Sequence, residues 1–142
     1  MFSSQSRDEL KRAVDACFGV SSEGDCSTGP HGPIGEWGVS RATDMSGMFY
    51  GLISFNQDLS KWDVSRVTSM HYMFNEAQSF NQDLSNWDVS RVTEMQWMFS
   101  YANSFRQTLC GAAWVNSNAS KIDMFAESPG SISKTVCGAW VH

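Results

Sequence analysis

Polar side chains that recur every 25 residues form the strongest candidate for a binding surface in this sequence. The eight residues occupy matching positions in two successive stretches and are Lys61, Asp63, Ser65, Arg66, Asn86, Asp88, Ser90 and Arg91. Such a regular surface could bind a protein or a glycan. The alternative is structural, because the two aspartates could instead pair with the arginines or satisfy the ends of neighbouring strands.

Methionine pairs repeat at the same period and suggest a second kind of chemistry. The pairs have the form Met-x-x-Met and lie at 45/48, 70/73 and 95/98. Thioether sulfur is a soft ligand that accepts Cu(I). However, these methionines alternate with phenylalanines, and flexible Met side chains commonly fill gaps in a core. We therefore predict a core role and no copper site.

Two further groups of residues are weaker candidates. Asn56, Asp58, Asn81 and Asp83 could together coordinate Ca²⁺, which needs six to eight oxygen ligands, but a turn explains these residues more simply. Tyr72 and Trp97 occupy equivalent positions with Tyr101 nearby, and an exposed aromatic patch would mark a binding site. We predict no metal and no cofactor.

The sequence lacks the patterns expected of an enzyme. His31, His71 and His142 are scattered and show no metal-ligand or catalytic-triad spacing. Nucleophile-elbow, phosphate-loop and dinucleotide-binding motifs are also missing from the sequence. We therefore expect a non-enzymatic protein.

An internal repeat must position all of these residues. Segments 54–78 and 79–103 are nearly identical and adjoin without a gap, so the period is 25 residues. The repeat explains the content of 8 Met, 6 Trp and 9 Phe, because these residues recur at fixed positions. One unit cannot bury its apolar face alone, so successive units are expected to stack into a solenoid.

The spacing within a unit predicts its local structure. Leu59-x-x-Trp62-x-Val64-x-x-Val67 matches the apolar positions of a leucine-rich repeat and indicates a short parallel strand. The steps of three and four residues in 67–77 indicate a short helix, for which Thr68 could be the N-cap. The prediction is an α/β repeat, a short leucine-rich-repeat-like solenoid of about three to four coils.

The motif FNQDLSxWDVSxVTxMxxMF resembles the BspA-like leucine-rich-repeat family of surface proteins, in its 25-residue branch, much of which is known as a domain of unknown function. The resemblance covers residues 36–105 closely. It implies an extracellular adhesion or recognition role and brings no catalytic residues.

Both ends of the repeat are expected to carry caps, which cover the apolar core. We predict an N-terminal cap at 1–35 with a helix at about 7–18, a repeat region at 36–109, and a degenerate coil with a C-terminal cap at 110–142, all in one domain. The helix should begin after Ser6, because Ser6 and Glu9 form a capping box.

The four cysteines lie in these caps, two at each end, and none lies in the repeats. We predict the disulfides Cys17–Cys26 and Cys110–Cys137, because each pair is local to its cap. Four buried thiols or a zinc site are the alternatives, although the distance between the caps argues against one shared zinc ion. Disulfides and the possible glycosylation site Asn118 favour an extracellular or cell-surface location.

Charge and hydropathy limit the partners. The net charge of −5 argues against nucleic acid as a partner, and no apolar run is long enough for membrane insertion. No signal peptide is recognisable at the start of the sequence. We predict a monomeric, secreted or cell-surface recognition or adhesion module that binds a protein or glycan through its strand face. The alternatives are a structural or self-assembling surface-layer unit and an ice-binding solenoid.

Overall fold

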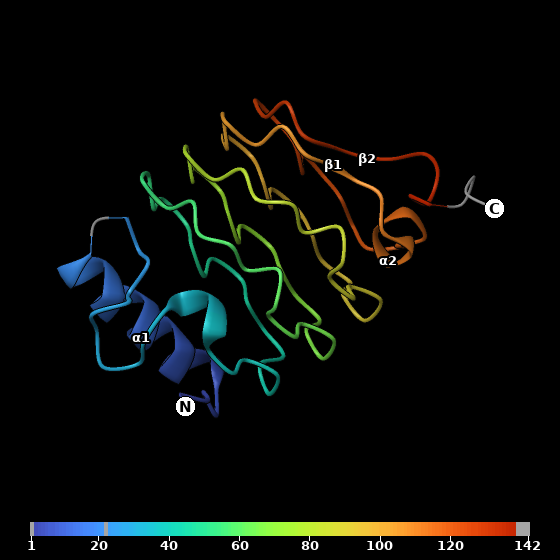
Figure 1. The fold of residues 1–142 in the computed structure, drawn as a ribbon. Helices are drawn as coiled ribbons and strands as arrows, with labels where there is room; N and C mark the ends of the chain where they lie inside the picture. The colour runs from blue at the N-terminus through green and yellow to red at the C-terminus, as the bar shows by residue number, and fades with distance from the viewer. Residues whose placement is uncertain (1, 22, 139–142) are drawn as a thin grey trace.

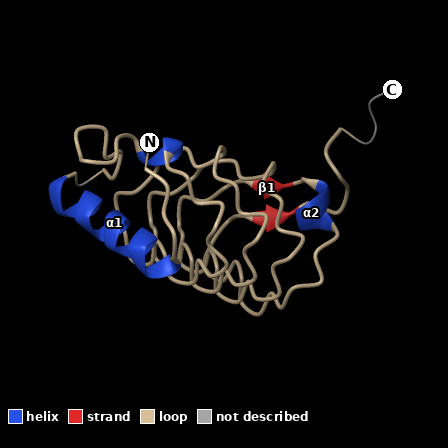
Figure 2. Ribbon diagram, turned by 90° about the horizontal axis from the view of Figure 1, so that it is seen from below, coloured by secondary structure: helices blue, strands red, loops and turns tan. Residues whose placement is uncertain are grey.

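Regular secondary structure lies near the two ends of the chain. A computed structural model describes residues 2–21 and 23–138. The elements are the helix α1 (Arg7–Val20), a 3₁₀ helix (Ile34–Glu36), the strand β1 (Thr108–Leu109), the helix α2 (Ala112–Val115) and the strand β2 (Ser131–Ile132). The two strands pair in parallel. Figures 1 and 2 show α1 at one end of the molecule and α2 with the strands at the other.

The predicted α/β solenoid, with a strand and a helix in every coil, is wrong. Residues 37–107 consist of turns, bends, isolated bridges and irregular chain. In the described part of the chain, the two strands have two residues each and form one small sheet. This is too little regular secondary structure for the multi-coil solenoid that the residue spacing predicted.

Backbone geometry explains why the predicted helix at 67–77 does not form. Tyr72 has a φ of 61°, which lies in the left-handed region and is incompatible with a right-handed helix. The N–H of Met73 donates to the carbonyl oxygen of Met70 at 3.1 Å, which closes a four-residue turn around Tyr72. Glu76, with a φ of 59°, has the same position in the next turn. The segment is therefore a series of turns.

Other backbone amides in these turns donate to the unit that follows. The Tyr72 N–H donates to the Gln96 carbonyl oxygen at 3.1 Å, and the Phe74 N–H donates to the Met98 carbonyl oxygen at 2.8 Å. Units one sequence repeat apart are thus joined through their backbones. Figure 1 shows these successive lengths of chain lying side by side between the two ends.

The core is built from the repeated apolar residues. The Phe74 ring lies between Phe49 and Phe99, with ring centroids 5.3 and 5.4 Å away and ring planes within 8°. All six methionines of the Met-x-x-Met pairs are fully buried. The interpretation of these methionines as core residues is therefore confirmed. Stacked rings of adjacent units exclude water along the length of the repeat.

Three of the buried tryptophans also connect neighbouring units. Each of these three indole N–H groups donates to a backbone carbonyl oxygen of the preceding unit, so a large apolar side chain is buried without losing its hydrogen bond. The bonds are Trp62 to Ile34 (2.9 Å), Trp87 to Leu59 (2.9 Å) and Trp114 to Leu84 (2.8 Å).

The helix α1 covers the N-terminal end of this core. Ser6 is its N-cap, and the Ser6 hydroxyl oxygen accepts the Glu9 N–H at 3.2 Å. Leu10, Val14 and Cys17 are buried on the face that meets the core. The helix extends to Val20, two residues beyond the predicted end.

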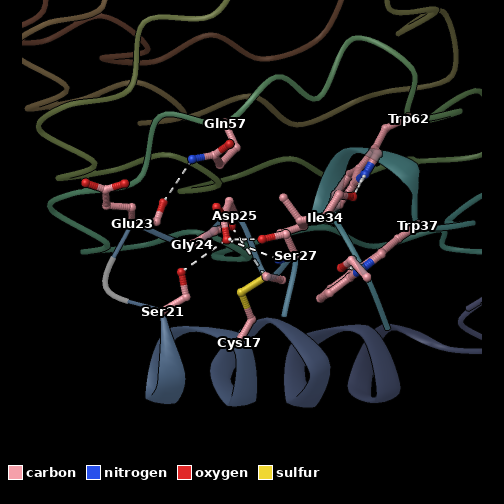
Figure 3. Close-up of a disulfide and its surroundings, with 12 residues drawn as sticks. Cys17, Ser21, Glu23, Gly24, Asp25, Ser27, Ile34, Trp37, Gln57 and Trp62 are labelled. Atoms are coloured by element: carbon pink, nitrogen blue, oxygen red, sulfur yellow. Dashed lines mark hydrogen bonds between the residues drawn. A yellow bond between two sulfur atoms is a disulfide. The ribbon is translucent and has the colours of Figure 1, made fainter. Parts of the chain in front are cut away.

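Both predicted disulfides are present. Cys17–Cys26 links α1 to the following loop, and Cys110–Cys137 joins residues near β1 and β2. Figure 3 shows the first disulfide below the loop that contains Glu23. The carbonyl oxygen of Glu23 accepts a hydrogen bond at 3.4 Å from the side-chain amide of Gln57, which lies in the repeat. The loop is therefore connected both to α1 and to the repeat.

The predicted domain boundaries, 1–35, 36–109 and 110–142, stay a prediction. Residue 1, residue 22 and residues 139–142 of the predicted caps lie outside the described residues. Trp114 follows Trp87 by 27 residues, and the unit with these two extra residues contains α2.

Candidate functional site

The predicted aspartates and serines lie together in local turns. Asp63 Oδ1 accepts the Ser65 N–H at 3.0 Å and the Ser65 hydroxyl at 2.6 Å. Asp88 Oδ1 accepts the Ser90 N–H at 3.0 Å. Hydrogen bonds from the serine side chains and backbones hold the pKa of both carboxyl groups below the ordinary value of 3.8. These carboxylates therefore stabilise turns, although they stay exposed.

Of the remaining predicted residues, two have an ion-pair or hydrogen-bond partner in a neighbouring unit. Lys61 forms an exposed ion pair with Glu36 at 3.0 Å, and the Asn86 side chain donates to the Ser60 carbonyl oxygen at 3.0 Å. The Lys61–Glu36 and Asn86–Ser60 pairs connect neighbouring units, so these two predicted binding residues already have structural partners.

The three arginines at equivalent positions are Arg41, Arg66 and Arg91, and all are exposed. Within residues 2–21 and 23–138, none of them has a carboxylate within 4 Å. The predicted pairing of Asp63 and Asp88 with these arginines therefore has no counterpart in the described residues. Whether the eight predicted residues bind a ligand stays a prediction.

A different surface gathers aromatic side chains from three successive units, and we call it the aromatic face. Its members are Tyr50, His71, Tyr72, Trp97 and Tyr101. Tyr72 and Trp97 stack with ring centroids 5.1 Å apart and planes 14° apart. Tyr50 meets Tyr72 edge-on at 6.5 Å, and both Tyr50 and Tyr101 are 52% exposed. The face therefore offers ring surface to solvent.

The two stacked residues have a left-handed backbone conformation, which is unfavourable for bulky side chains. Tyr72 and Trp97 have φ values of 61° and 54°. Gly47 and Asp123 stand at the corresponding positions of the flanking units, and both residue types tolerate this region. A bulky residue there costs about 1–2 kcal/mol. Such outliers are concentrated at functional sites. The presence of bulky aromatic residues at both positions therefore makes this face a candidate functional site.

Two hollows flank the stacked pair, and Tyr72 lines both. The first has a volume of about 530 Å³ and is also lined by Lys11, Tyr50 and His71. The second has a volume of about 550 Å³ and is also lined by Trp97, among other residues. Ligand sites commonly combine aromatic walls with a few polar groups in volumes of this size.

The sequence prediction found only part of this face. It named Tyr72, Trp97 and Tyr101 but placed them on a helix, whereas the structure places them on turns. Tyr50 was missed because non-aromatic residues, Asn75 and Ser100, stand at its position in the next two units. His71 was considered only as a metal or catalytic ligand.

The oxygen atoms considered for Ca²⁺ take part in hydrogen bonds between and within units. Asn56 Oδ1 accepts the Asn81 N–H at 2.8 Å, and Asp83 Oδ1 accepts the Ser85 N–H at 2.9 Å. Across the described ranges, His, Cys, Asp and Glu form no group of three or more that could hold a metal ion. His142 lies outside those ranges.

None of the helices described is long and apolar enough to cross a membrane.

Comparison with known proteins places the chain in a family. No curated protein and no solved structure shows significant similarity to the chain. A family model matches residues 21–140, which is most of the sequence. The chain therefore belongs to the family described as Mycoplasma protein of unknown function, DUF285.

Proposed function

We propose that this protein is a non-enzymatic, secreted or cell-surface recognition module that binds a glycan or a protein through the aromatic face. The stacked pair of Tyr72 and Trp97, held in left-handed turns between two hollows, is the observation that carries this proposal. The resemblance to BspA-like surface repeat proteins supports such a role but names no ligand, and the family to which the chain belongs is described as of unknown function.

Aromatic rings favour a glycan over other ligands on this face. The apolar side of a sugar ring can pack against an aromatic plane, and nearby polar groups can bond its hydroxyl groups. Glu76 and Asp123 stand beside Trp97 in the second hollow and provide hydrogen-bond acceptors. A protein partner with exposed aliphatic side chains is the other ligand class that this surface suits.

The two disulfides support the proposed location. Disulfides form and persist in oxidising compartments and are rare in the reducing cytosol. Cys17–Cys26 and Cys110–Cys137 pair all four cysteines of the chain. We therefore propose that the protein folds in an export pathway and works outside the cytosol.

Binding through the repeated polar residues around Asp63 and Asp88, and ice binding, have less support than binding through the aromatic face. The two aspartates already accept hydrogen bonds within their own turns. Ice binding would use the exposed threonines that recur once in each unit, Thr43, Thr68 and Thr93. However, the hydroxyl groups of Thr68 and Thr93 donate to backbone carbonyl oxygens at 3.2 Å. Self-assembly through the aromatic face would be marked by association that increases with protein concentration.

A binding comparison between matched variants tests the proposal. The wild type would be applied to a glycan array and to immobilised surface proteins beside the variants Trp97→Ala and Ile53→Ala. Ile53 is 56% exposed and lines neither hollow, so it controls for the loss of exposed apolar surface. The proposal expects Trp97→Ala alone to lose at least about tenfold in affinity. Equal binding by all three proteins would overturn it.

A further inference from the structure

A third hollow lies beside α2 and involves two of the residues predicted from the sequence. It has a volume of about 520 Å³, and Arg91 and Ser90 form part of its wall. The other polar groups in the wall are Thr93, Asn116, Ser117 and Asn118. These residues are separate from the aromatic face. The wall thus combines one cation with hydroxyl and amide groups and contains no carboxylate.

The two-residue insertion of the last unit distinguishes Arg91 from the other arginines of its column. The inserted unit contains α2, and Ala112 and Ala113 of this helix line the hollow together with the Arg91 segment. Arg66 is the equivalent residue one unit earlier, and the unit beside it has no helix at the corresponding place, 85–88. Arg91 alone of the column lines this hollow.

A second cation supports the loop that completes the wall. Lys121 Nζ donates to the carbonyl oxygen of Ser117 at 2.7 Å and to that of Ala119 at 3.2 Å. Neither Lys121 nor Arg91 has a carboxylate within 4 Å in the described part of the chain. Two cations with no carboxylate within 4 Å therefore lie in the wall or are bonded to it, although the whole chain is acidic. Asp88 lies farther from Arg91, and the pKa of its carboxyl group is lowered by the hydrogen bonds of its turn and further by the arginine charge.

We infer that this hollow binds an acidic sugar residue, with the Arg91 guanidinium paired to the sugar carboxylate. A guanidinium binds a carboxylate through two parallel hydrogen bonds. The Ser90 hydroxyl and the amides of Asn116 and Asn118 can bond sugar hydroxyl groups, which are both donors and acceptors. The Thr93 hydroxyl donates to the Thr68 carbonyl oxygen at 3.2 Å, so it is available to a sugar only as an acceptor. A volume of about 520 Å³ is within the range of small-ligand sites.

The test uses two sugars that differ in one group, methyl β-glucuronide and methyl β-glucoside. The protein is produced without N-glycosylation, so that Asn118 carries no glycan, and is titrated with each sugar while backbone amide resonances are followed by NMR. The glucuronide should shift the amide resonances of residues 116–119. The neutral glucoside should bind about tenfold more weakly, because it lacks the carboxylate. Inorganic phosphate is titrated separately as a general anion.

Variants separate this site from general charge effects and from the aromatic face. Arg91→Ala should weaken glucuronide binding about tenfold, whereas Arg66→Ala removes an equivalent exposed charge and should change it less than about twofold. Ile53→Ala, at an exposed residue that lines none of the three hollows, should leave it unchanged. Because binding is read at the amides of residues 116–119, this site and the aromatic face can fail independently. Similar losses in both arginine variants, equal binding of the two sugars, or phosphate binding as tight as the glucuronide at the same amides would overturn the inference.

Discussion

The aromatic ring of Tyr72 lies on that of Trp97, with ring centroids 5.1 Å apart and planes 14° apart, and both residues have a left-handed backbone. The two residues occupy the same position in consecutive 25-residue units. The turn that presents each ring is bonded to the next unit through its backbone amides. The core that joins the units therefore also fixes the spacing of the exposed rings.

Replacing glycine by alanine at a turn position with a left-handed backbone should lower the stability of the protein. Gly51 has a φ of 71° and open space around its Cα, so Gly51→Ala adds backbone strain without a steric clash. We expect a loss of roughly 1 kcal/mol in the free energy of unfolding. Urea denaturation followed by circular dichroism measures this change.

The matched control for that substitution is Gly19→Ala. Gly19 lies in α1 and also has open space around it, but its backbone is helical. Alanine is favoured over glycine in a helix by about 0.5–1 kcal/mol, less near a helix end, so this variant should gain stability. Changes of the same sign in both variants would contradict the assigned turn geometry.

This contrast also explains what could be predicted from the sequence. The period, the buried Met, Trp and Phe positions and the capping of α1 by Ser6 follow directly from residue types. The helix predicted at 67–77 was wrong, because consecutive four-residue turns bury apolar residues at the same steps of three and four. Gly47 and Gly51, four residues apart in the first unit, were the available signal for left-handed turns.

The candidate site was harder to predict than the core. Tyr72 and Glu76 stand where the first unit has glycine. The residue types in their own unit therefore do not indicate a left-handed backbone at these positions. The repeated polar residues that include Asp63 were predicted to form a binding surface. In the structure, however, the Asp63 carboxylate accepts a hydrogen bond within its own turn. Sequence spacing shows which residues share a surface but not which of their atoms already have hydrogen-bond partners.

Stability should fall in acid because of the turn aspartates. The pKa values of Asp63 and Asp88 are lowered in the folded protein by hydrogen bonds from Ser65 and Ser90. The unfolded state therefore binds protons more readily, and the stabilisation present above the ordinary pKa of 3.8 is lost as the pH falls through the folded values. Urea denaturation between about pH 6 and about pH 2.5 should show this loss.

The variant Asp63→Asn isolates one carboxyl group. Its amide oxygen can still accept the Ser65 N–H, but it does not titrate in this range. The variant should lose less stability than the wild type over the same fall in pH. An identical pH dependence would show that Asp63 contributes nothing to acid sensitivity.

The two disulfides should contribute unequally to stability. Cys17–Cys26 closes a separation of 9 residues and Cys110–Cys137 one of 27. In the chain-entropy model the loss of the shorter link costs about 2.5 kcal/mol and that of the longer link about 3.5 kcal/mol. Denaturation of the paired variants Cys17→Ser/Cys26→Ser and Cys110→Ser/Cys137→Ser measures the difference. Full stability in either variant would refute a stabilising role for that link.

The indole N–H resonance of Trp97 offers the most direct test of recognition through the aromatic face. The indoles of Trp62, Trp87 and Trp114 donate to buried backbone carbonyl oxygens and serve as internal references. On titration with the strongest ligand from the glycan and protein screens, the account predicts a shift confined to Trp97 and abolished binding in Trp97→Ala. An unmoved Trp97 resonance at saturation, with undiminished binding by Trp97→Ala, would contradict it.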